Sequence, residues 1–323
     1  MTSNLPSFPG VAAKPGAVAT LSGDELARRV AIATHAARGA DAPNTVRTYS
    51  AGVKAFVAWC DRTGRAYALP VAPADLAAFV DDMAGQLSPA SLNAYVSALD
   101  RMHRDLDLTP PGAAQVVRLA KRRMRRDIGT AQRQARPMGF EAIGPALAAM
   151  GSDLPGLRDA ALIAVAYDTM ARASELVALR VKDIQHSGGG ASAYIARSKT
   201  DQEGAGQFRF IAPDTFRRVA AWVAAARLDP ESPLFIPLSN SGRSDQITTR
   251  DVSRIFKRRM GKDYSAHSTR VGAAIDQLQA KEDTARIMQA GGWKSPVMVA
   301  RYTRQADAQN SAAAGLARKQ GRA

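Results

Sequence analysis

Apolar residues recur every three or four positions through most of the segments between residues 43 and 127, which is the spacing of one buried helix face. In the segment 43–64 the pattern stops near Gly64. The residues that form its stripe are Val46, Tyr49, Val53, Phe56 and Val57. The segments 72–86, 88–106 and 109–127 repeat the pattern, each with Pro near its start, where a helix tolerates it. Four helices are therefore predicted in this part of the chain.

A further helix is predicted over the segment 22–36. It begins with Ser22 and Glu25, which have the spacing of a capping box. The residues before it lack the basic region and clean apolar core of a secretory signal, and we expect a flexible arm over residues 1–21. The helical pattern as a whole predicts one domain over residues 22–128.

The pattern changes after this domain. Residues 129–140 have no clear period, contain Gly and Pro and are basic, which indicates an interdomain linker. In the second domain, residues 141–323, two extended runs (192–200 and 207–212) flank the sequence DQEGAG and predict a β-hairpin. Helical periodicity returns around the hairpin in the segments 155–171, 173–181, 213–228, 248–261, 268–281, 283–292 and 296–305. We therefore predict a mainly α fold with a small antiparallel sheet in its second domain.

Composition supports two domains and narrows the setting. The chain has 323 residues, 46% of them apolar, which is enough for two sizeable cores. Its apolar runs, such as AALIAVAY and VAAWVAAA, are much shorter than a membrane span. Cys60 is the single cysteine, so an intramolecular disulfide and a cysteine-based metal cluster are excluded. We expect a protein of the reducing cytoplasm.

The charge is strongly positive and concentrated. Lys and Arg number 44 against 29 Asp and Glu, a formal net charge of +15. The segment 118–136 carries eight Lys or Arg residues and one Asp, whereas a solvated helix face normally mixes both signs. Its neighbours provide no large apolar face for a lipid surface. The sequence therefore predicts that this protein binds nucleic acid.

The residue inventory restricts the chemistry. The four His residues have no metal-ligand spacing, and there is no carboxylate cluster or phosphate-binding loop of the GxxxxGK[ST] type. Chemistry on a phosphodiester would then need cationic donors for the phosphate oxygens, a proton donor for the leaving oxygen and a protein nucleophile. The chain has candidates for each part, namely Arg172, Lys199, His267, Arg270, Trp293 and Tyr302. Taken singly, each has an ordinary alternative as a surface cation, a helix cap or a core aromatic residue.

Taken together and in order, these residues resemble the tyrosine recombinase (phage integrase) superfamily. The phrases that carry the resemblance are ARASELVALRVKDI, RSKT, HSTRVGAA and IMQAGGWKSPVMVARYTR, together with the KRRMRR run before the linker. The resemblance extends over about residues 22–316. It implies a helical core-binding domain and an α-rich catalytic domain with a small antiparallel sheet, which form a C-shaped clamp around DNA.

The resemblance also implies a role for each residue. Arg172 and Arg270 would clamp the scissile phosphate, and Tyr302 would attack it to leave a 3′-phosphotyrosine. Lys199 would protonate the leaving 5′ oxygen, and His267 would assist proton transfer from the tyrosine.

Two further residues complete the implied active site. Trp293 would donate its indole N–H to a phosphate oxygen. Glu175 matches an acidic position that orients the site, although an ordinary role in a surface or helix pair stays open. No cofactor and no metal would be needed.

DNA contacts are expected from three regions. The basic helix would contact the backbone through Lys121, Arg122, Arg123, Arg125 and Arg126. In the helix predicted over 88–106, the candidates for base contacts are Ser91, Asn93 and Tyr95. In the second domain, Arg250 stands where a member of the superfamily contacts a base.

The resemblance implies an assembly as well. The expected partner is a double-stranded DNA site with inverted repeats, bound by a monomer that dimerises on each site and forms a homotetramer on two synapsed sites. The segment 310–319 would be the helix that docks into a neighbouring subunit. No membrane and no accessory protein are expected.

Two alternatives differ from a recombinase. One is a DNA-binding protein of the same fold that does not cut, which the intact set of six residues disfavours. The other is a type IB topoisomerase or telomere resolvase, which the short length and the helical first domain disfavour.

Overall fold

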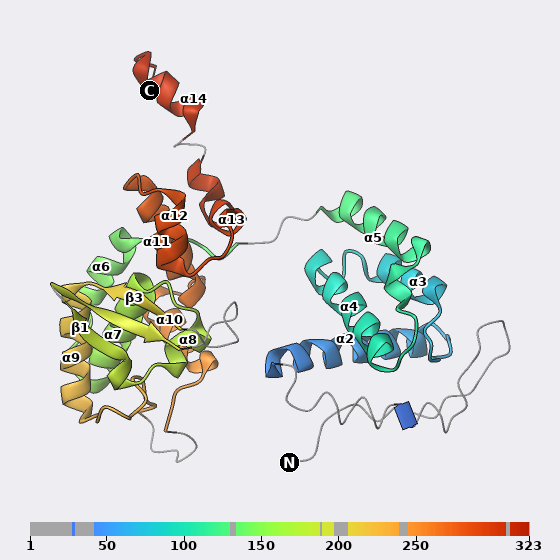
Figure 1. Cartoon of the computed structure of the whole chain (residues 1–323), viewed down its shortest axis with the longest axis horizontal. Coiled ribbons are helices and arrows are strands. Elements are labelled where there is room, and N and C mark those ends of the chain that lie inside the picture. Colours follow the sequence, from blue (N-terminus) through green and yellow to red (C-terminus); the bar gives the residue numbers. More distant parts are fainter. Residues whose placement is uncertain are drawn as a thin grey trace. The chain divides into compact units, whose positions relative to one another are not determined.

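The computed structural model describes residues 28–29, 42–129, 134–187, 189–196, 206–238, 245–307 and 311–322 (Figure 1). The predicted arm, most of the helix predicted over 22–36 and the candidate Lys199 lie outside the described residues. The chain divides into two compact units, Met1–Arg133 and Gln134–Ala323.

The first unit is built from helices whose starts follow from the local sequence. Pro is the first residue of α2, α3 and α4. The hydroxyl of Ser88 accepts the backbone N–H of Ser91 and so caps the start of α4. The elements are α2 (Pro43–Arg62), α3 (Pro73–Met83), α4 (Pro89–Asp105), η1 (Pro111–Ala113) and α5 (Gln115–Ile128). The helices predicted over these segments are confirmed.

Helix α2 packs against α4, and α3 packs against α5. The core between them is aromatic at one end, where the ring of Phe56 lies 5.8 Å from Trp59 and 5.4 Å from Phe79. The indole N–H of Trp59 donates to Asp82 Oδ2 at 2.8 Å, so this buried polar group is satisfied. Cys60 is buried beside Trp59.

His103 is a buried polar residue in the same core. Its Nε2 accepts the backbone N–H of Val71 at 2.9 Å, and its Nδ1 faces the carbonyl oxygen of Leu99 at 2.7 Å. A carbonyl can only accept, so Nδ1 carries the proton and the ring is neutral. Burial lowers the pKa of His103 below its ordinary value of 6.5 and outweighs the opposing effects of Leu99 and Asp100.

The stability of the first unit should therefore fall in mild acid. Above pH 6.5 both the folded and unfolded states hold a neutral His103, and below it the unfolded state takes up a proton that the folded state resists. We expect a loss of up to about 1.4 kcal/mol per pH unit below 6.5. Hydrogen exchange of residues 99–106 in the full chain, corrected for the intrinsic effect of pH, measures it. His103→Gln should flatten the dependence, and a flat wild-type profile would contradict the prediction.

The second unit consists of helices around a small sheet. Its helices are α6 (Phe140–Ala148), α7 (Leu154–Asp168), α8 (Ala173–Ala178), η2 (Val181–Asp183), α9 (Pro213–Ala226), α10 (Thr249–Met260), α11 (Ala266–Gln279), α12 (Thr284–Gly291), α13 (Pro296–Asp307) and α14 (Ala312–Lys319). Its strands are β1 (Ile184–Ser187), β2 (Gly190–Ile195) and β3 (Gln207–Ile211). Within the described ranges, no helix combines the length and the apolar character that crossing a bilayer requires. The predicted class, mainly α with a small antiparallel sheet, is confirmed.

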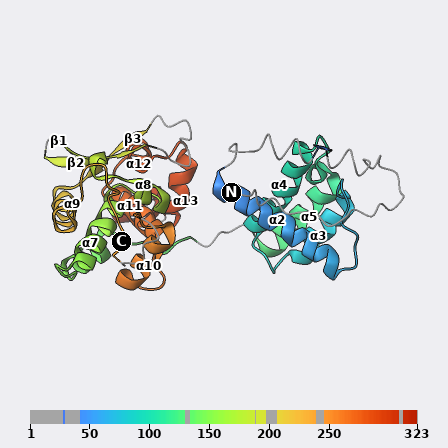
Figure 2. The same ribbon diagram turned by 90° about the horizontal axis from the view of Figure 1, so that it is seen from below.

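The three strands are antiparallel in the order β1-β2-β3, and α7 and α9 pack on one face of the sheet (Figure 2). Side chains alternate between the two faces of a strand. In β3, Arg209 and Ile211 are buried, whereas Phe208 and Phe210 are more than half exposed. Arg209 is thus an arginine on the buried face of a sheet.

Strand β1 and helix α6 were not predicted. Strand β1 is four residues long and has no clear alternation of its own, and it exists because its backbone pairs with β2 from Ile184↔Ala193 to Ser187↔Gly190. The predicted hairpin is therefore part of a three-stranded sheet. Helix α6 begins at Phe140, the last residue of the predicted linker, and packs against α7 and α11 through Ile143 and Leu147.

A buried carboxylate joins α7 to α10. Asp159 is fully buried, and its two oxygens accept hydrogen bonds from Arg158, Arg258 and Arg259 at 2.7–3.0 Å. Burial alone would raise the pKa of Asp159, but these three guanidinium groups outweigh it and lower the pKa. The cluster determines how α10, which carries the candidate Arg250, is held against the core.

The segment that enters the second unit lies directly on α11. The backbone N–H of Met138 donates to the carbonyl of Ser268 at 3.0 Å. A Cβ at Gly272 would lie 2.1 Å from the carbonyl carbon of Met138, so only glycine permits this approach. The start of the unit is therefore packed beside the helix that carries His267 and Arg270.

Candidate active site

Helix α11 places two of the predicted residues on one side, one turn apart. It begins at Ala266 after Ser265, whose backbone N–H donates to the Ser268 hydroxyl at 3.1 Å. His267 stays solvent accessible at the start of the helix. Arg270 is only 1% exposed.

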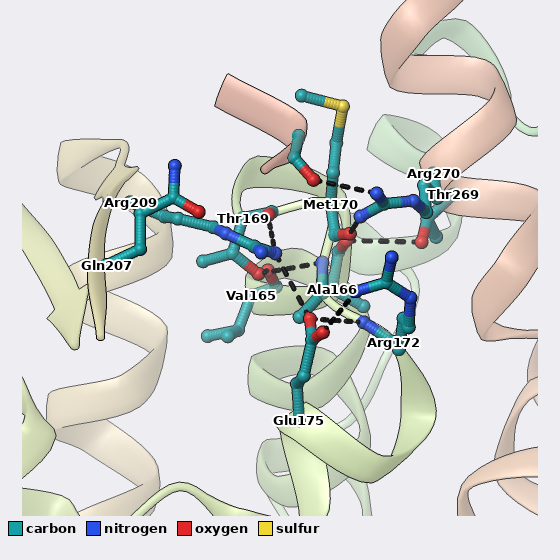
Figure 3. A network of polar contacts seen from close by, with 12 residues as sticks. Val165, Ala166, Thr169, Met170, Arg172, Glu175, Gln207, Arg209, Thr269 and Arg270 are labelled. Carbon is teal, nitrogen blue, oxygen red and sulfur yellow. Dashed lines mark hydrogen bonds and ion pairs between the residues drawn. The ribbon is translucent and has the colours of Figure 1, made fainter. Parts of the chain in front are cut away.

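Arg270 is held by two backbone carbonyls. It donates through Nη1 to Met170 and through Nη2 to Gly291 at 2.7 Å (Figure 3). Burial, and then the charges of Arg172 and Arg209, lower its pKa, but a guanidinium group remains charged at neutral pH. Its Nε–H has no hydrogen-bond partner among the described residues. The fixed guanidinium therefore keeps its Nε–H as a donor for a ligand.

Arg172 and Glu175 form a pair at the start of α8. The backbone N–H of Arg172 donates to Glu175 Oε2 at 2.9 Å, and its Nη1 donates to Oε1 at 2.5 Å. The side chain of Glu175 is 2% exposed, whereas that of Arg172 is 23% exposed. The acid therefore lies behind the arginine, whose guanidinium can reach solvent or a ligand.

Trp293 follows a turn that requires glycine. Helix α12 ends in Gly292 with φ of +62°, and a Cβ there would lie 2.6 Å from Arg209 Nη2 and from Gln207 Oε1. The turn carries Trp293 under Arg270, whose guanidinium carbon lies 4.4 Å from the ring centroid. The buried indole N–H of Trp293 has no partner within the described part of the chain.

Helix α13 brings Tyr302 to the same place. Its ring centroid lies 5.3 Å from that of Trp293 and 5.3 Å from that of His267. Its backbone carbonyl accepts the side-chain amide of Gln134 at 2.9 Å. The hydroxyl-bearing residue is thus held by packing on one side and by the entering segment on the other.

The pKa of His267 is below its ordinary value. Partial burial is the first cause, followed by the positive charges of Arg270, Arg172 and Arg301. Because the pKa of His267 lies below 6.5, the imidazole is mostly neutral at pH 7. The ring is therefore able to accept a proton.

The structure brings most of the predicted residues together. Those that converge are Arg172, Glu175, His267, Arg270, Trp293 and Tyr302. Lys199 lies outside the described residues, in the segment between β2 and β3. Three buried donors, on Arg209, Arg270 and Trp293, have no partner among the described residues. Together with the guanidinium groups of Arg172, Arg209 and Arg270 near the Glu175 carboxylate, they make a site for an anion.

The predicted DNA-contacting residues lie on α4, α5 and α10. The exposed ones are Arg122, Arg123, Arg125, Arg126 and Arg250, and those that are half-buried are Ser91, Asn93, Tyr95 and Lys121. The hydroxyl of Ser91 is bonded to that of Ser88 at 2.9 Å. Arg123 is paired with Asp81 at 2.5 Å.

Arg209 belongs to the site but was missed by reasoning from the sequence. Its Nη1 donates to Glu175 Oε2 at 3.2 Å and to the carbonyl of Thr169 at 3.0 Å (Figure 3). The signal was present in QFRFIA, where strand alternation puts Arg209 on the same face as the buried Ile211. A cation on the buried face of a strand needs an acidic partner.

Comparison with known proteins identifies the class. The model of the phage integrase family matches residues 142–309, and the chain belongs to this family. The chain is 28% identical over 286 residues to recombinase Cre of Escherichia phage P1, covering 80% of this chain and 83% of that one. It is 29% identical over 282 residues to an integrase/recombinase XerD homolog of Selenomonas ruminantium, covering 82% of each.

Solved structures of tyrosine recombinases share the fold. A crystal structure of the XerH site-specific recombinase, bound to a palindromic difH substrate in a post-cleavage complex, matches with a TM-score of 0.60 at 19% identity over 83% of this chain and 78% of that one. A lambda integrase dimer bound to a core site matches with a TM-score of 0.56 at 17% identity over 86% and 76%. These two structures, both under 20% identical to this chain, show that the fold is shared.

Proposed function

We propose that this protein is a site-specific DNA recombinase that cuts and rejoins DNA strands through a 3′-phosphotyrosine intermediate. The observation that carries the proposal is the convergence of Arg270, His267 and Trp293 on Tyr302, with a buried indole N–H that has no partner within the described residues. Buried donors of this kind are costly unless a ligand satisfies them. A phosphate diester, held beside a tyrosine hydroxyl, satisfies them and places phosphorus next to a nucleophile.

In the proposed cleavage step, the oxygen of Tyr302 attacks the scissile phosphorus and the bond to the 5′ oxygen breaks. The products are a 3′-phosphotyrosine and a free 5′-hydroxyl, and the leaving oxygen takes its proton from Lys199. Arg172 and Arg270 bind the non-bridging oxygens, where charge develops in the transition state. Glu175 orients Arg172 through the hydrogen bond at 2.5 Å.

His267 accepts the proton that Tyr302 loses. Its lowered pKa keeps the ring neutral at pH 7, and its ring packs edge-on against Tyr302 at 5.3 Å between centroids. Trp293 donates its indole N–H to a phosphate oxygen and packs against both Arg270 and Tyr302.

The phosphotyrosine bond conserves the energy of the broken diester. The 5′-hydroxyl of a second strand reverses the attack and joins to the 3′ phosphate, so strand exchange balances without a nucleotide or a metal ion. We propose that exchange takes place between two inverted-repeat sites held in a tetramer, with the segment 310–319 docking into a neighbouring subunit.

The first unit is proposed to bind the DNA core site. The start of the predicted linker 129–140 is proposed to follow the DNA backbone, since Gln134 and the residues after it belong to the second unit. The helix α5 ends in exposed Arg125 and Arg126. Phosphate contacts of this kind set affinity and its salt dependence, whereas α4 and Arg250 on α10 are proposed to read bases.

Removal of these charges should therefore act on salt dependence. Because each variant loses one phosphate contact, Arg125→Ala and Arg126→Ala should each make the negative slope of the log of the DNA association constant against log salt shallower by about 0.9. Sequence preference should stay unchanged. Arg123→Ala is the matched comparison on the same helix: its pairing with Asp81 predicts a smaller change. Binding titrations over a range of salt concentrations measure the slopes, and unchanged slopes in the first two variants would contradict the prediction.

A selection tests the proposed function and finds the target. The protein is incubated with duplexes that carry random inverted repeats, and DNA that stays attached through SDS denaturation is sequenced. We expect one enriched site and a phosphopeptide containing Tyr302. Duplexes bound natively without an adduct would indicate a DNA-binding relative that does not cut, and relaxation of plasmids lacking the site would indicate a topoisomerase.

A further inference from the structure

Arg209 is a buried arginine to which the proposed cleavage chemistry gives no part. Its side chain is 1% exposed and lies on the inward face of β3, in register with Ala193 of β2. Burial lowers its pKa, and of the charges near it Glu175 opposes that effect while Arg172 adds to it. A buried guanidinium is costly to hold, so its partners indicate what it does.

Those partners lie in the candidate active site or next to it in the chain. Arg209 Nη1 bridges Glu175 Oε2 and the carbonyl of Thr169, which precedes Met170 by one residue. Met170 in turn accepts the hydrogen bond of Arg270. Arg209 Nη2 lies directly behind Gly292, the residue before Trp293. The Arg209 side chain therefore contacts Glu175 directly and packs against the backbone next to the residues that hold Arg270 and Trp293.

The charge balance gives Arg209 a more specific part. Glu175 is shared by two guanidinium groups, with Arg172 at 2.5 Å from one oxygen and Arg209 at 3.2 Å from the other. If Arg209 were absent, the buried carboxylate would have Arg172 as its single side-chain partner among the described residues. The Arg172–Glu175 pair would then have no net charge, and its attraction for a bound anion would be weak.

We propose that Arg209 is a positioning residue whose charge offsets that of Glu175, so that Arg172 keeps its own charge for the scissile phosphate. This inference rests on the proposed function. With Arg209, the described site has three guanidinium groups and one carboxylate, a net of two positive charges. Without Arg209 the net is one, which matches the single negative charge of a diester but not the greater charge of the transition state.

The test is a comparison of four variants on the selected duplex. Arg209→Gln removes the charge but keeps a donor for Thr169, Arg209→Lys keeps the charge, Glu175→Gln removes the acid, and Arg209→Gln with Glu175→Gln removes both. Rate constants for single-turnover formation of the covalent adduct are measured at saturating DNA, below all melting transitions, and DNA affinity is measured separately.

We expect Arg209→Gln to slow adduct formation about 10- to 100-fold, the usual range for a residue that acts through another. Arg209→Lys should stay within about tenfold of wild type, because it retains the charge. The double variant should be at least about tenfold faster than Arg209→Gln alone, because loss of the acid frees Arg172 again. DNA affinity should change little in all four.

The matched control is Arg158→Gln, which removes another buried arginine of this unit that pairs with a carboxylate, at 2.8 Å from Asp159. It should lower the melting temperature and leave the rate constant for adduct formation within about twofold of wild type. Its pair contacts none of the residues that converge on Tyr302, and saturating DNA removes any effect on binding through α10. This separates loss of stability from loss of positioning.

Each outcome decides between the two proposals. An adduct in wild type with an unchanged rate in Arg209→Gln, or a double variant no faster than Arg209→Gln, would overturn the positioning role and leave the proposed function intact. Absence of the adduct in wild type would overturn the proposed function, and the inference with it.

Discussion

Replacement of Tyr302 by phenylalanine is expected to abolish covalent attachment to DNA while leaving DNA binding intact. The substitution removes the hydroxyl oxygen and keeps the ring that packs on Trp293 and His267. Without an oxygen at this position no phosphotyrosine can form, and loss of a nucleophile typically lowers the rate on the order of 10⁶-fold. The adduct should fall below detection on SDS gels.

Affinity for the selected duplex should stay the same within error, because a single hydroxyl contributes little beside the many phosphate contacts expected of α5. The matched control is Tyr264→Phe, which removes one hydroxyl from a half-buried tyrosine that packs under Arg136 in the same unit. This variant should form the adduct at the wild-type rate. An SDS-stable adduct in Tyr302→Phe would show that another residue is the nucleophile.

The second large effect is expected at the two arginines of the phosphate clamp. Arg172→Lys and Arg270→Lys each keep one positive charge but lose the planar fork that binds two oxygens at once. We expect the rate of adduct formation to fall about 10²- to 10³-fold in each, the usual cost of one lost donor to a developing anion. Single-turnover cleavage of the selected duplex measures the effect.

The two variants should differ in stability. The side chain of Arg172 is 23% exposed, so its replacement should leave the melting temperature nearly unchanged. Arg270 holds the carbonyls of Met170 and Gly291 together, and its replacement should also lower the melting temperature. Arg286→Lys, on the exposed side of α12, is the control and should change neither quantity. Wild-type cleavage rates in both clamp variants would refute the clamp.

The helices of the first unit were predictable because the start signal and the apolar periodicity of each helix lie within its own sequence. Helices α2, α3 and α4 begin at a proline and keep one apolar stripe, so their bounds match the sequence pattern closely. Strand β1 lacks such a signal. Its four residues are extended because their backbone pairs with that of β2, and such pairing depends on the neighbouring strand more than on the residues of β1 themselves.

For the candidate site too, the local motifs could be predicted from the sequence but their arrangement in space could not. The order and local surroundings of Arg172, His267, Arg270, Trp293 and Tyr302 were readable from the chain, since each stands in a distinctive phrase. Their joint geometry was not, because it depends on how helices far apart in the sequence pack, as α11 does with α13.

By itself the sequence determined most of the helical segments, the basic segment, the hairpin and the residue types available for phosphate chemistry, because periodicity, charge and local motifs are properties of short stretches. Only the tertiary structure decided that Arg209 shares Glu175 with Arg172, and that Gln134 reaches the carbonyl of Tyr302. The physical reason is burial: a side chain's partner in the core is set by the packing of distant elements, and the free energy of a buried charge depends on that partner.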